Sequence, residues 1–377
     1  MTLVVDIHAL HTIPPSLINR DDTGAPKSAI FGGVPRQRVS SQSWKRAIRK
    51  YFGQKIGKDR LGLRSKKLPE IIGARVLEIA PDFGLDNAVE GVKSLFEETK
   101  ITIVKPKSGK DTKKDSKNQS PYPTTEALLF LSPHQIERAA QEIVAARGEK
   151  ISEKDAAEIL DTRHSIDMAM FGRMLAKPAA FSVDAAVQVA HAIGVHESQP
   201  EFDFFTAVDD VVENADETGA GMMGTVQMMS STLYRFATVN VDGLAANLGD
   251  VELALPATNM FIRAFIESMP TGKQNTFANN TLPELVYVAI RDTRSVSLVN
   301  AFEDPVEGKD GTRRQAAARA LAQEAREIEE TYGMKPIGSF VLATGGLDEA
   351  FGDFAEKVNL PELGERVLDV LSSAKEE

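Results

Sequence analysis

A run of basic residues dominates the amino-terminal part of the chain. Between Arg36 and Lys67 there are twelve Lys or Arg residues and a single acid, Asp59. This window carries a formal charge of +11, and the rest of the chain therefore carries −21, because the total is −10. Clustered positive charge in an acidic chain is typical of a site for nucleic acid, a polyanion. The alternative is an ordinary solvated helix face that acidic residues balance elsewhere.

The spacing inside this run predicts an amphipathic helix with one face anchored in a core. Ser41 is the predicted N-cap, since its hydroxyl can accept a hydrogen bond from an amide of the first turn. The apolar stripe consists of Trp44, Ala47, Ile48, Tyr51 and Phe52. Gln42, Lys45 and Arg49 fall on one flank of this stripe, and Arg46 falls on the other. Because two cations four residues apart repel each other, a phosphate between Lys45 and Arg49 would stabilise the pair.

A polar, glycine-containing segment from Ser16 to Gly33 precedes this helix and is predicted to be a loop. Its Gly32-Gly33 pair suits a backbone that approaches a ligand closely or turns with positive φ, although such a pair usually marks a turn. Arg20, Lys27 and the helix N-terminus would together form an anion-binding concavity. The loop and the helix therefore predict a phosphate site.

The same residues resemble a known family. The run IHAL…NRDD…K…FGG…R…SSQSWKRAIRK, between Ile7 and Lys50, is similar to the amino-terminal region of the CasC family. Members of that family are the RAMP-superfamily backbone subunits of the type I-E CRISPR Cascade surveillance complex. Further matches follow at AMFGRML (169–175), VDAAVQVAHAI (183–193), DFFTAVDD (203–210), YRFATVN (234–240) and TGKQNTFAN (271–279). The resemblance spans most of the chain, apart from the lysine-rich loop around 105–120 and the carboxy-terminal tail.

The resemblance implies a scaffold without catalytic residues. Several copies would form a helical filament along CRISPR guide RNA (crRNA), a head-to-tail assembly that does not close, together with other Cascade subunits. Contacts to the sugar–phosphate backbone carry no sequence information, so the bases could pair with target DNA in antiviral defence. The matching motifs imply RNA contacts at Asn19, Arg20, Lys27, Ser40, Gln42, Lys45 and Arg49, to which we add Arg46 on the basic helix and Lys273 in TGKQNTFAN.

The segment from Phe202 to Ser231 is predicted to be a projecting hairpin, or thumb. Three glycines surround the Met222-Met223 pair near its tip, where little core is available. Exposed apolar side chains there would suit insertion between stacked bases or docking on a neighbouring subunit. In the resembled family this hairpin reaches over the guide RNA of the next subunit, and Phe205, Thr206 and Met223 occupy the matching positions.

A mostly helical insertion, or finger, is predicted for residues 55–180. The family implies a base-contacting methionine here, and either Met170 or Met174 in AMFGRM could fill that role. The insertion also contains the polar loop from Lys105 to Pro121, whose composition is typical of disorder. Its lysines are candidate DNA contacts, with an ordinary surface loop as the alternative: Lys105, Lys107, Lys110, Lys113, Lys114 and Lys117.

The periodicity of the rest predicts an α+β fold with strands at Leu3–His11, Phe181–Val195, Leu233–Val241 and Leu285–Arg291, and with helices at the basic segment and at Leu253–Ser268. The order β-α-β-β-α-β is that of a ferredoxin-like, or RRM-like, sheet. We therefore expect an RRM-like palm of residues 1–54, 181–201 and 232–377, a finger at 55–180 and a thumb at 202–231.

The competing hypothesis is a metal-dependent endoribonuclease of the related type III backbone class. Asp21 and Asp22 lie beside the predicted RNA-binding loop, and paired carboxylates can hold Mg²⁺ near a phosphate. The alternative role of these two acids is to pair with Arg20 or Lys27 and orient the loop.

Other chemistry finds little support in the sequence. The chain has no Cys, so thiolate metal sites, thiol nucleophiles and disulfides are excluded. His8 and His11 lie at i and i+3 of a predicted strand and so point to opposite faces, a poor chelating geometry. No P-loop, G-x-S-x-G motif or credible catalytic triad is present. We expect no enzyme activity, no cofactor and no metal.

The first residues, MTLVVDIHAL, contain no basic side chain before the apolar run, and Asp6 interrupts that run. No stretch approaches ~18 uninterrupted apolar residues, so neither secretion nor membrane spanning is indicated. The expectation is a cytoplasmic protein.

Overall fold

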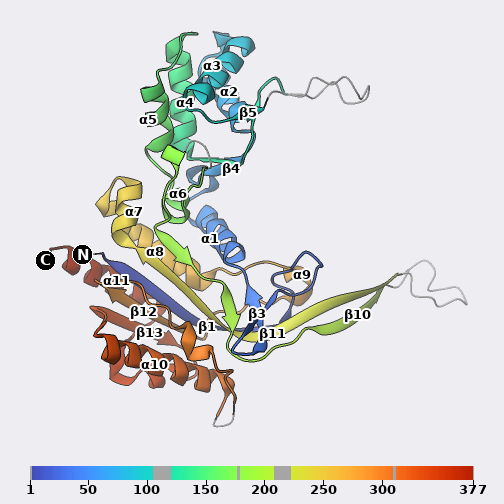
Figure 1. Cartoon of the computed structure of the whole chain (residues 1–377), viewed down its shortest axis with the longest axis vertical. Coiled ribbons are helices and arrows are strands. Elements are labelled where there is room, and N and C mark those ends of the chain that lie inside the picture. The colour runs from blue at the N-terminus through green and yellow to red at the C-terminus, as the bar shows by residue number, and fades with distance from the viewer. Residues whose placement is uncertain (1, 105–119, 176–178, 208–221, 309–310, 377) are drawn as a thin grey trace, which may run out of the picture. The chain divides into compact units, whose positions relative to one another are not determined.

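The computed structural model describes residues 2–104, 120–175, 179–207, 222–308 and 311–376 (Figure 1). The chain forms two compact units. The first, which we call the sheet unit, contains residues 1–51, 188–240 and 258–377, and the second, the helical unit, contains residues 52–187 and 241–257. The finer division into palm, finger and thumb stays a prediction. Among the described residues, no helix combines the length and the hydrophobicity that a membrane span requires.

A large mixed sheet organises the sheet unit. Its strand order is β14-β13-β12-β1-β11-β9-β3-β2, and β8 and β10 also pair with β11. Neighbours from β13 to β2 are antiparallel, whereas β13 and β14 are parallel. The strands are β1 (Val4–Ser16), β2 (Ser28–Phe31), β3 (Val34–Val39), β8 (Val187–Val189), β9 (Ala192–Gly194), β10 (Glu201–Ala207), β11 (Met222–Asn240), β12 (Leu285–Arg291), β13 (Gly338–Ala343) and β14 (Glu356–Lys357).

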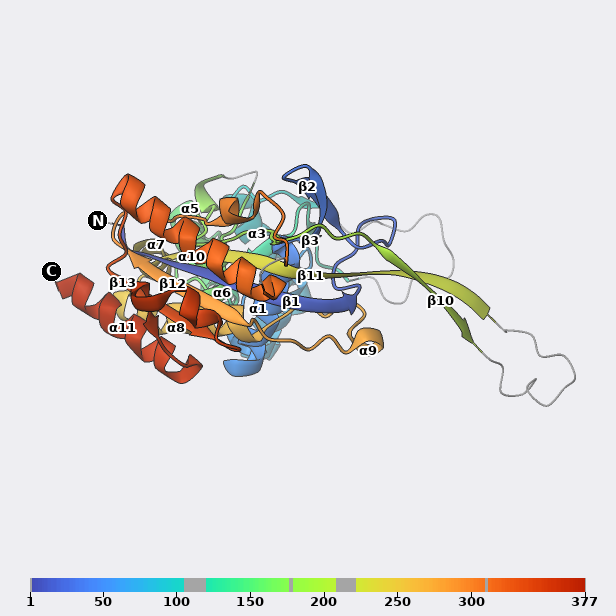
Figure 2. The same cartoon turned by 90° about the horizontal axis from the view of Figure 1, so that it is seen from below.

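The two faces of this sheet have different covers. Leu10 of β1 pairs with Tyr234 of β11, and both belong to a core cluster with the alanine-rich side of α10. The next position, Arg235, points to the opposite face, where it lies against Trp44 of α1 and Phe265 of α8. Figure 2 shows α10 and α11 beside the carboxy-terminal strands. The helices that lie wholly or partly in this unit are α1 (Ser41–Lys55), α8 (Val251–Glu267), α9 (Gln274–Phe277), α10 (Arg313–Tyr332) and α11 (Leu360–Glu376).

The helical unit packs short helices around a separate apolar core. Ser132 starts α4 with a capping box, in which its hydroxyl accepts from Gln135 N–H while the Gln135 side chain accepts from Ser132 N–H. The helices are α2 (Leu68–Ile79), α3 (Leu85–Glu98), α4 (Pro133–Ala146), α5 (Glu153–Asp161), α6 (Ile166–Phe171) and α7 (Val241–Leu248). Two small antiparallel pairs complete it, β4 (Leu63–Ser65) with β7 (Leu129–Leu131) and β5 (Ile103–Val104) with β6 (Thr124–Thr125).

The predicted elements agree with the structure in part. The predicted strand Leu285–Arg291 is confirmed as β12. The strand predicted at Leu3–His11 exists as β1 but continues to Ser16, and the one predicted at Leu233–Val241 exists as β11 but begins at Met222. Three predictions are wrong. Residues 181–195 form two short strands, β8 and β9, and not one continuous strand; part of the predicted loop, Ser28–Phe31, is β2; and β12 is not the last strand, since β13 and β14 follow it.

Two buried histidines make the sheet unit sensitive to acid. Burial lowers the pKa of His8 and of His11 to about 3, with smaller effects from Arg291 and Arg235 respectively. In the unfolded chain both groups titrate near pH ~6.5, so below that pH the unfolded chain binds protons that the folded chain refuses. Their contribution to stability is complete above pH ~6.5 and falls by about 1.4 kcal/mol per pH unit for each histidine below it.

We expect urea unfolding to show this loss between pH 7.5 and 5.5, and a His8→Phe variant to reduce it by about 1.4 kcal/mol. Phenylalanine keeps an aromatic ring among Tyr234, Phe236 and Tyr287, on which the imidazole stacks. Burial raises the pKa of Asp6, which opposes the loss on acidification, so the test is the difference between the two proteins. An identical pH dependence in both would contradict the assignment.

Candidate nucleic-acid interface

Asn19 joins the NRDD loop to the start of α1. Its side-chain Oδ1 accepts a hydrogen bond from the backbone N–H of Ser40 (2.8 Å), and its carbonyl accepts one from the N–H of Lys27 (3.0 Å). The helix starts at Ser41, and the Ser40 carbonyl accepts from Trp44 N–H, so the predicted cap at Ser41 is wrong by one residue. The Asn19 side chain therefore ties the loop to the start of α1, which fixes where their basic side chains begin.

The apolar stripe of α1 is confirmed at Trp44, Ala47, Ile48 and Phe52, whereas Tyr51 is partly exposed. Trp44 and Ile48 are at most 1% exposed. Gln42 and Arg46 are exposed, whereas Lys45 is partly buried. Burial lowers the pKa of Lys45, which means that its ammonium group is incompletely hydrated. An anion beside such a group restores the lost stabilisation of the charge, so Lys45 is suited to bind phosphate.

Three further basic residues are Arg20 and Lys27 of the loop and Arg46 of α1. Within the described part of the chain, no carboxylate forms an ion pair with Arg20, Lys27 or Arg46. Arg20 and Arg46 are exposed, and Arg49 and Lys27 are partly exposed. The proposed phosphate site thus keeps its positive charge at the surface.

Asp21 has a structural role in the loop. Its Oδ1 accepts hydrogen bonds from Thr23 N–H (2.9 Å), Thr23 Oγ1 (2.8 Å) and Ala25 N–H (3.0 Å), a side-chain turn that closes residues 21–25. These hydrogen bonds lower the pKa of Asp21, and the bond from the Thr23 hydroxyl has the largest effect. Asp22 is exposed. The predicted pairing of these acids with Arg20 or Lys27 is not seen, but Asp21 does orient the loop. Among the described residues, no cluster of His, Asp or Glu could hold a metal ion.

Gly32 and Gly33 form the two-residue turn between β2 and β3. Their φ angles are +57° and +79°, as a type I′ hairpin turn requires. The pair therefore serves as a turn, the usual role of such a dipeptide. Of the two, only Gly32 also makes a close approach, because a Cβ there would meet the backbone of Glu303.

Arg36 does not belong to the basic surface. It is fully buried, and its guanidinium donates hydrogen bonds to the carbonyls of Gly194 (2.9 Å), Phe302 (3.2 Å) and Glu303 (3.0 Å). The hydrogen bonds of Arg36 to these three carbonyl groups help to hold the β2–β3 hairpin in place. The charge that the Arg36–Lys67 window offers to a ligand is smaller than the residue count predicts.

A second loop brings Lys273 beside the first. A Cβ at Gly272 would lie 2.3 Å from the carbonyl oxygen of Ile18, so only glycine allows these two loop backbones to touch. His11 anchors the far end of the second loop, because its Nε2 and Thr281 Oγ1 share a hydrogen bond (3.0 Å). The exposed Lys273 therefore starts from a backbone that packs directly against the residues preceding Asn19.

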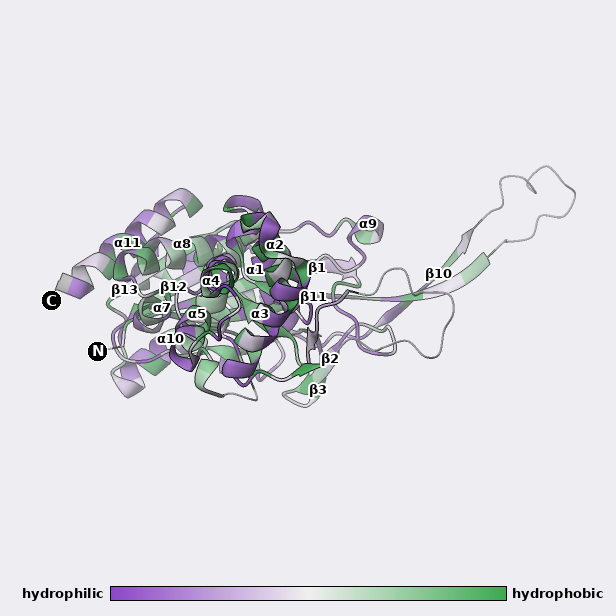
Figure 3. Ribbon diagram, turned by 90° about the horizontal axis from the view of Figure 1, so that it is seen from above, coloured by the Kyte–Doolittle hydropathy of each residue, from purple (hydrophilic) through white to green (hydrophobic). Residues whose placement is uncertain are grey.

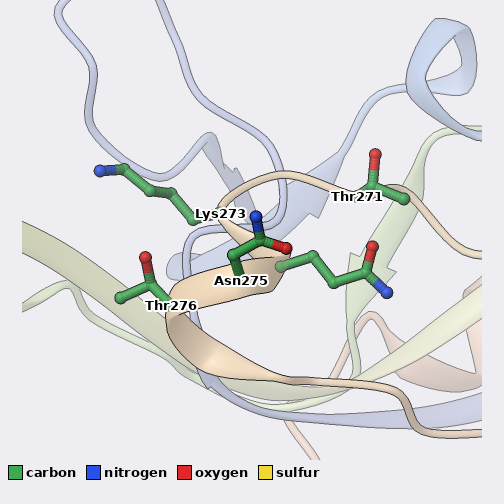
Figure 4. Close-up of a pocket in the computed structure, with 5 residues that line it drawn as sticks. Thr271, Lys273, Asn275 and Thr276 are labelled. Atoms are coloured by element: carbon green, nitrogen blue, oxygen red, sulfur yellow. The ribbon is translucent and has the colours of Figure 1, made fainter.

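This second loop also lines a pocket of about 400 Å³ (Figure 4). The groups around it are hydroxyl, amide and ammonium groups. The lining residues are Thr271, Lys273, Gln274, Asn275 and Thr276. Of these five residues, the sequence predicted an RNA contact only at Lys273, although all five lie in the TGKQNTFAN motif.

A long antiparallel hairpin of β10 and β11 carries exposed apolar side chains. Register pairs Thr206 with Met223 and Phe204 with Thr225, so these side chains share one face of the hairpin. Phe204 is 75% exposed and Met223 is 74% exposed. Phe205 points to the other face, against Gly224, and is 44% exposed. Figure 3 shows hydrophobic and hydrophilic segments following one another along this hairpin.

The two methionines that were predicted as alternative base contacts in the finger differ in exposure. Met170 lies in α6 and is fully buried, so it has no surface for a base, whereas Met174 is 90% exposed. Of the two predicted alternatives, only Met174 has the accessibility that stacking needs. The candidate DNA-contacting lysines lie outside the described residues: Lys105, Lys107, Lys110, Lys113, Lys114 and Lys117.

Comparison with known proteins gives a consistent result. A family model described as "CT1975-like protein" matches residues 5–366. A solved chain described as "CRISPR RNA-guided surveillance complex, pre-nicking" is 34% identical, with a TM-score of 0.82 over 97% of this chain and 99% of the other. A second, described as "CRISPR RNA-guided surveillance complex", is 29% identical, with a TM-score of 0.73 over the same shares. The search of curated proteins found no match.

Proposed function

This chain belongs to the CT1975-like protein family, and from that premise we propose that it is a subunit of a CRISPR RNA-guided surveillance complex that binds guide RNA by its phosphates. It acts without catalysis, as a CasC-type backbone subunit of a type I-E complex. Several copies form a filament along the RNA, beside other Cascade subunits, and leave its bases free to pair with target DNA. The protein works in the cytoplasm.

The observation that carries this proposal is the anchored basic helix. Trp44 and Ile48 fix α1 against the sheet, so Lys45 and Arg49 extend from a rigid base beside the Asn19 loop. Because the backbone of α1 is already ordered, binding a phosphate has to order only the two side chains, which favours affinity. Lysine and arginine contacts to phosphate read no base, which suits a subunit that must accept any guide sequence.

The strand order supports a ferredoxin-like palm. In chain order β1, β9, β11 and β12 are the first to fourth strands of the motif, with α1 after the first and α8 before the fourth. In the sheet they are arranged β12-β1-β11-β9, which is fourth, first, third, second. That arrangement is the one expected of a β-α-β-β-α-β unit with antiparallel neighbours.

The β10–β11 hairpin supports assembly. Isolated exposed apolar residues are common, but Phe204 and Met223 are both exposed on one face of the described part of the β10–β11 hairpin. Insertion between bases or docking on another molecule would bury such side chains. A head-to-tail contact of this kind leaves an open filament.

The test compares RNA binding of the native protein with that of a Lys45→Ala, Arg49→Ala double variant. We expect the native protein to bind single-stranded RNAs of unrelated sequence alike, and the double variant to bind all of them at least tenfold more weakly, since hydrogen bonds to charged groups contribute about 1.5–3 kcal/mol. The dependence of log affinity on log salt should flatten by roughly 0.7 for each lost phosphate contact.

The control is a Lys357→Ala, Arg366→Ala variant. It removes the same charge near β14, where the exposed Lys357 of β14 forms an ion pair with Asp348 and the exposed Arg366 of α11 forms one with Glu356. Its RNA affinity should remain native. Strong preference for one RNA sequence would contradict the proposal. Magnesium-dependent cutting of bound RNA that Asp21→Ala or Asp22→Ala abolishes would favour the endoribonuclease.

A further inference from the structure

A second basic cluster lies at the β2–β3 edge of the sheet and consists of Lys27, Arg38 and His191. The Arg38 guanidinium donates a hydrogen bond to Nδ1 of His191 (3.0 Å) and a longer one from Nε to the carbonyl of Ser28 (3.4 Å). His191 is exposed, and Arg38 and Lys27 are partly exposed. Neither Arg38 nor His191 was among the residues that the sequence predicted to contact RNA.

The register of the strands explains why these side chains meet. The backbone N–H of Arg38 donates to the carbonyl of Lys27 (2.9 Å), which continues the β2–β3 pairing by one residue. Arg38 also pairs with Ile193 of β9, two positions after His191. Directly opposed residues and residues two apart share one face of a sheet, so Lys27, Arg38 and His191 point to the same side.

The cluster is electrostatically incomplete. Within the described part of the chain, no carboxylate forms an ion pair with Lys27 or Arg38. Burial has the largest effect on the pKa of His191 and lowers it. The charges of Arg38 and, less strongly, Lys27 lower it further, and no acidic group raises it. Cations held near one another without an acid repel, and a bound anion removes that repulsion.

The hydrogen bond to Arg38 also fixes the state of His191. Because Nδ1 accepts from the guanidinium, the neutral ring carries its hydrogen on Nε2. The imidazole therefore holds the guanidinium fork in one orientation and offers a further N–H donor beside it. A planar fork with a neighbouring donor and an ammonium group matches the oxygens of a phosphodiester.

We propose that Lys27, Arg38 and His191 form a second phosphate site, which binds a phosphodiester of the same RNA strand as the Lys45–Arg49 flank of α1. Arg38 makes the charged contact, and His191 positions it. This inference rests on the proposed function, because it extends the expected contact at Lys27 to two residues that the family resemblance did not select. Arg38 and the α1 flank are connected through Asn19, which bonds to both Lys27 and Ser40.

The test uses the full chain, single-stranded RNAs of two unrelated sequences and single-stranded DNA of equal length. Arg38→Ala should weaken RNA binding about three- to tenfold and flatten the salt dependence by roughly 0.7, the value for one phosphate on a single strand. His191→Ala should weaken binding less and leave the salt dependence unchanged, because the ring is neutral. His191→Gln, whose amide oxygen can also accept from Arg38, should restore most of the affinity.

A spectroscopic readout separates binding from mere structure. A phosphate beside the ring stabilises its protonated form, so NMR titration should show the pKa of His191 rising when RNA binds. Arg366→Ala, at the other end of the sheet, is the charge-matched control and should change neither quantity. Urea unfolding checks that each variant retains the native fold, so that a change in affinity is not a consequence of unfolding.

Each outcome decides between the two proposals. Native RNA affinity and salt dependence in Arg38→Ala, with no change in the pKa of His191, would overturn the second site while leaving the α1 site in place. If Arg38→Ala weakened binding to single-stranded DNA but not to RNA, the assignment of this site to RNA would be overturned. Equal RNA affinity in the native protein, Arg38→Ala and the Lys45→Ala, Arg49→Ala variant would overturn the proposed function itself.

Discussion

Replacing Arg235 by alanine is expected to lower the free energy of unfolding by about 3–5 kcal/mol. Arg235 is 1% exposed, and its guanidinium lies 3.7 Å from the ring centre of Trp44 and 4.3 Å from that of Phe265. It also donates to Nδ1 of His11 (3.1 Å) and to the carbonyl of Phe265. Alanine removes the cation–π contacts and leaves two buried acceptors without a donor, each of which costs about 1–3 kcal/mol.

The volume-matched variant Arg235→Met tells packing from charge. Burial lowers the pKa of Arg235 to about 9, which shows that the protein holds the cation at a cost. Methionine fills most of the same space between Trp44 and Phe265 without burying a charge, so we expect a loss of about 1–2 kcal/mol. Urea unfolding at pH 7.5 measures both variants. Equal losses in the two would contradict the packing argument.

RNA binding supplies a further control on Arg235. The side chain has almost no contact with solvent, so it cannot touch a phosphate. A folded Arg235→Met protein should therefore bind RNA within about twofold of the native protein, because α1 stays anchored by Trp44 and Ile48. A large loss of affinity with little loss of stability would mean that the charge of Arg235 acts on the Lys45–Arg49 flank of α1.

Arg235 also shows what the sequence can and cannot reveal. The helical spacing of Trp44, Ala47 and Ile48 predicted a buried stripe because helix periodicity is a local property, and the structure confirms it. The apolar run Leu285–Arg291 predicted β12 for a similar reason. In contrast, a buried arginine has no local signature, because its partners come from α1, α8 and β1.

The errors at the site have the same cause. Counting charges placed Arg36 on the surface, although carbonyls distant in sequence surround it. Met170 and Met174 look equivalent in the sequence, yet one is buried in the core and the other is 90% exposed. The strand at Ser28–Phe31 lacks a buried face, since Ile30 is 72% exposed, so periodicity could not identify it.

The contacts between loops were equally hidden. Gly272 against Ile18, and Arg38 against His191, join segments that are far apart in the chain. Motif matching identified the TGKQNTFAN loop and the NRDD loop separately, and it gave no reason to place them side by side. Residue types were therefore enough to select candidate residues, whereas the arrangement of these residues depends on sheet register and glycine contacts.

Gly32 provides the sharpest test of that geometry. A Cβ at this position would lie 1.6 Å from the carbonyl oxygen of Glu303, and φ is +57°. Alanine would add left-handed strain of about 1–2 kcal/mol to a backbone overlap that costs about 1–3 kcal/mol to relieve. We expect Gly32→Ala to lower the free energy of unfolding by about 2–5 kcal/mol in urea.

Gly33→Ala is the matched control, because it lies in the same turn with φ +79° but a Cβ there would meet nothing within 4 Å. It should lose only the strain contribution, about 1–2 kcal/mol. Since the overlap can be relieved only if the hairpin moves away from Glu303, Gly32→Ala should also speed amide exchange in β2 and β3 more than Gly33→Ala does. The same movement carries Lys27 and Arg38 away from their positions, so RNA affinity should fall in Gly32→Ala and stay near native in Gly33→Ala. Indistinguishable stability and exchange in the two variants would show that Gly32 serves the turn alone, and that the hairpin does not depend on this contact to hold its basic side chains in place.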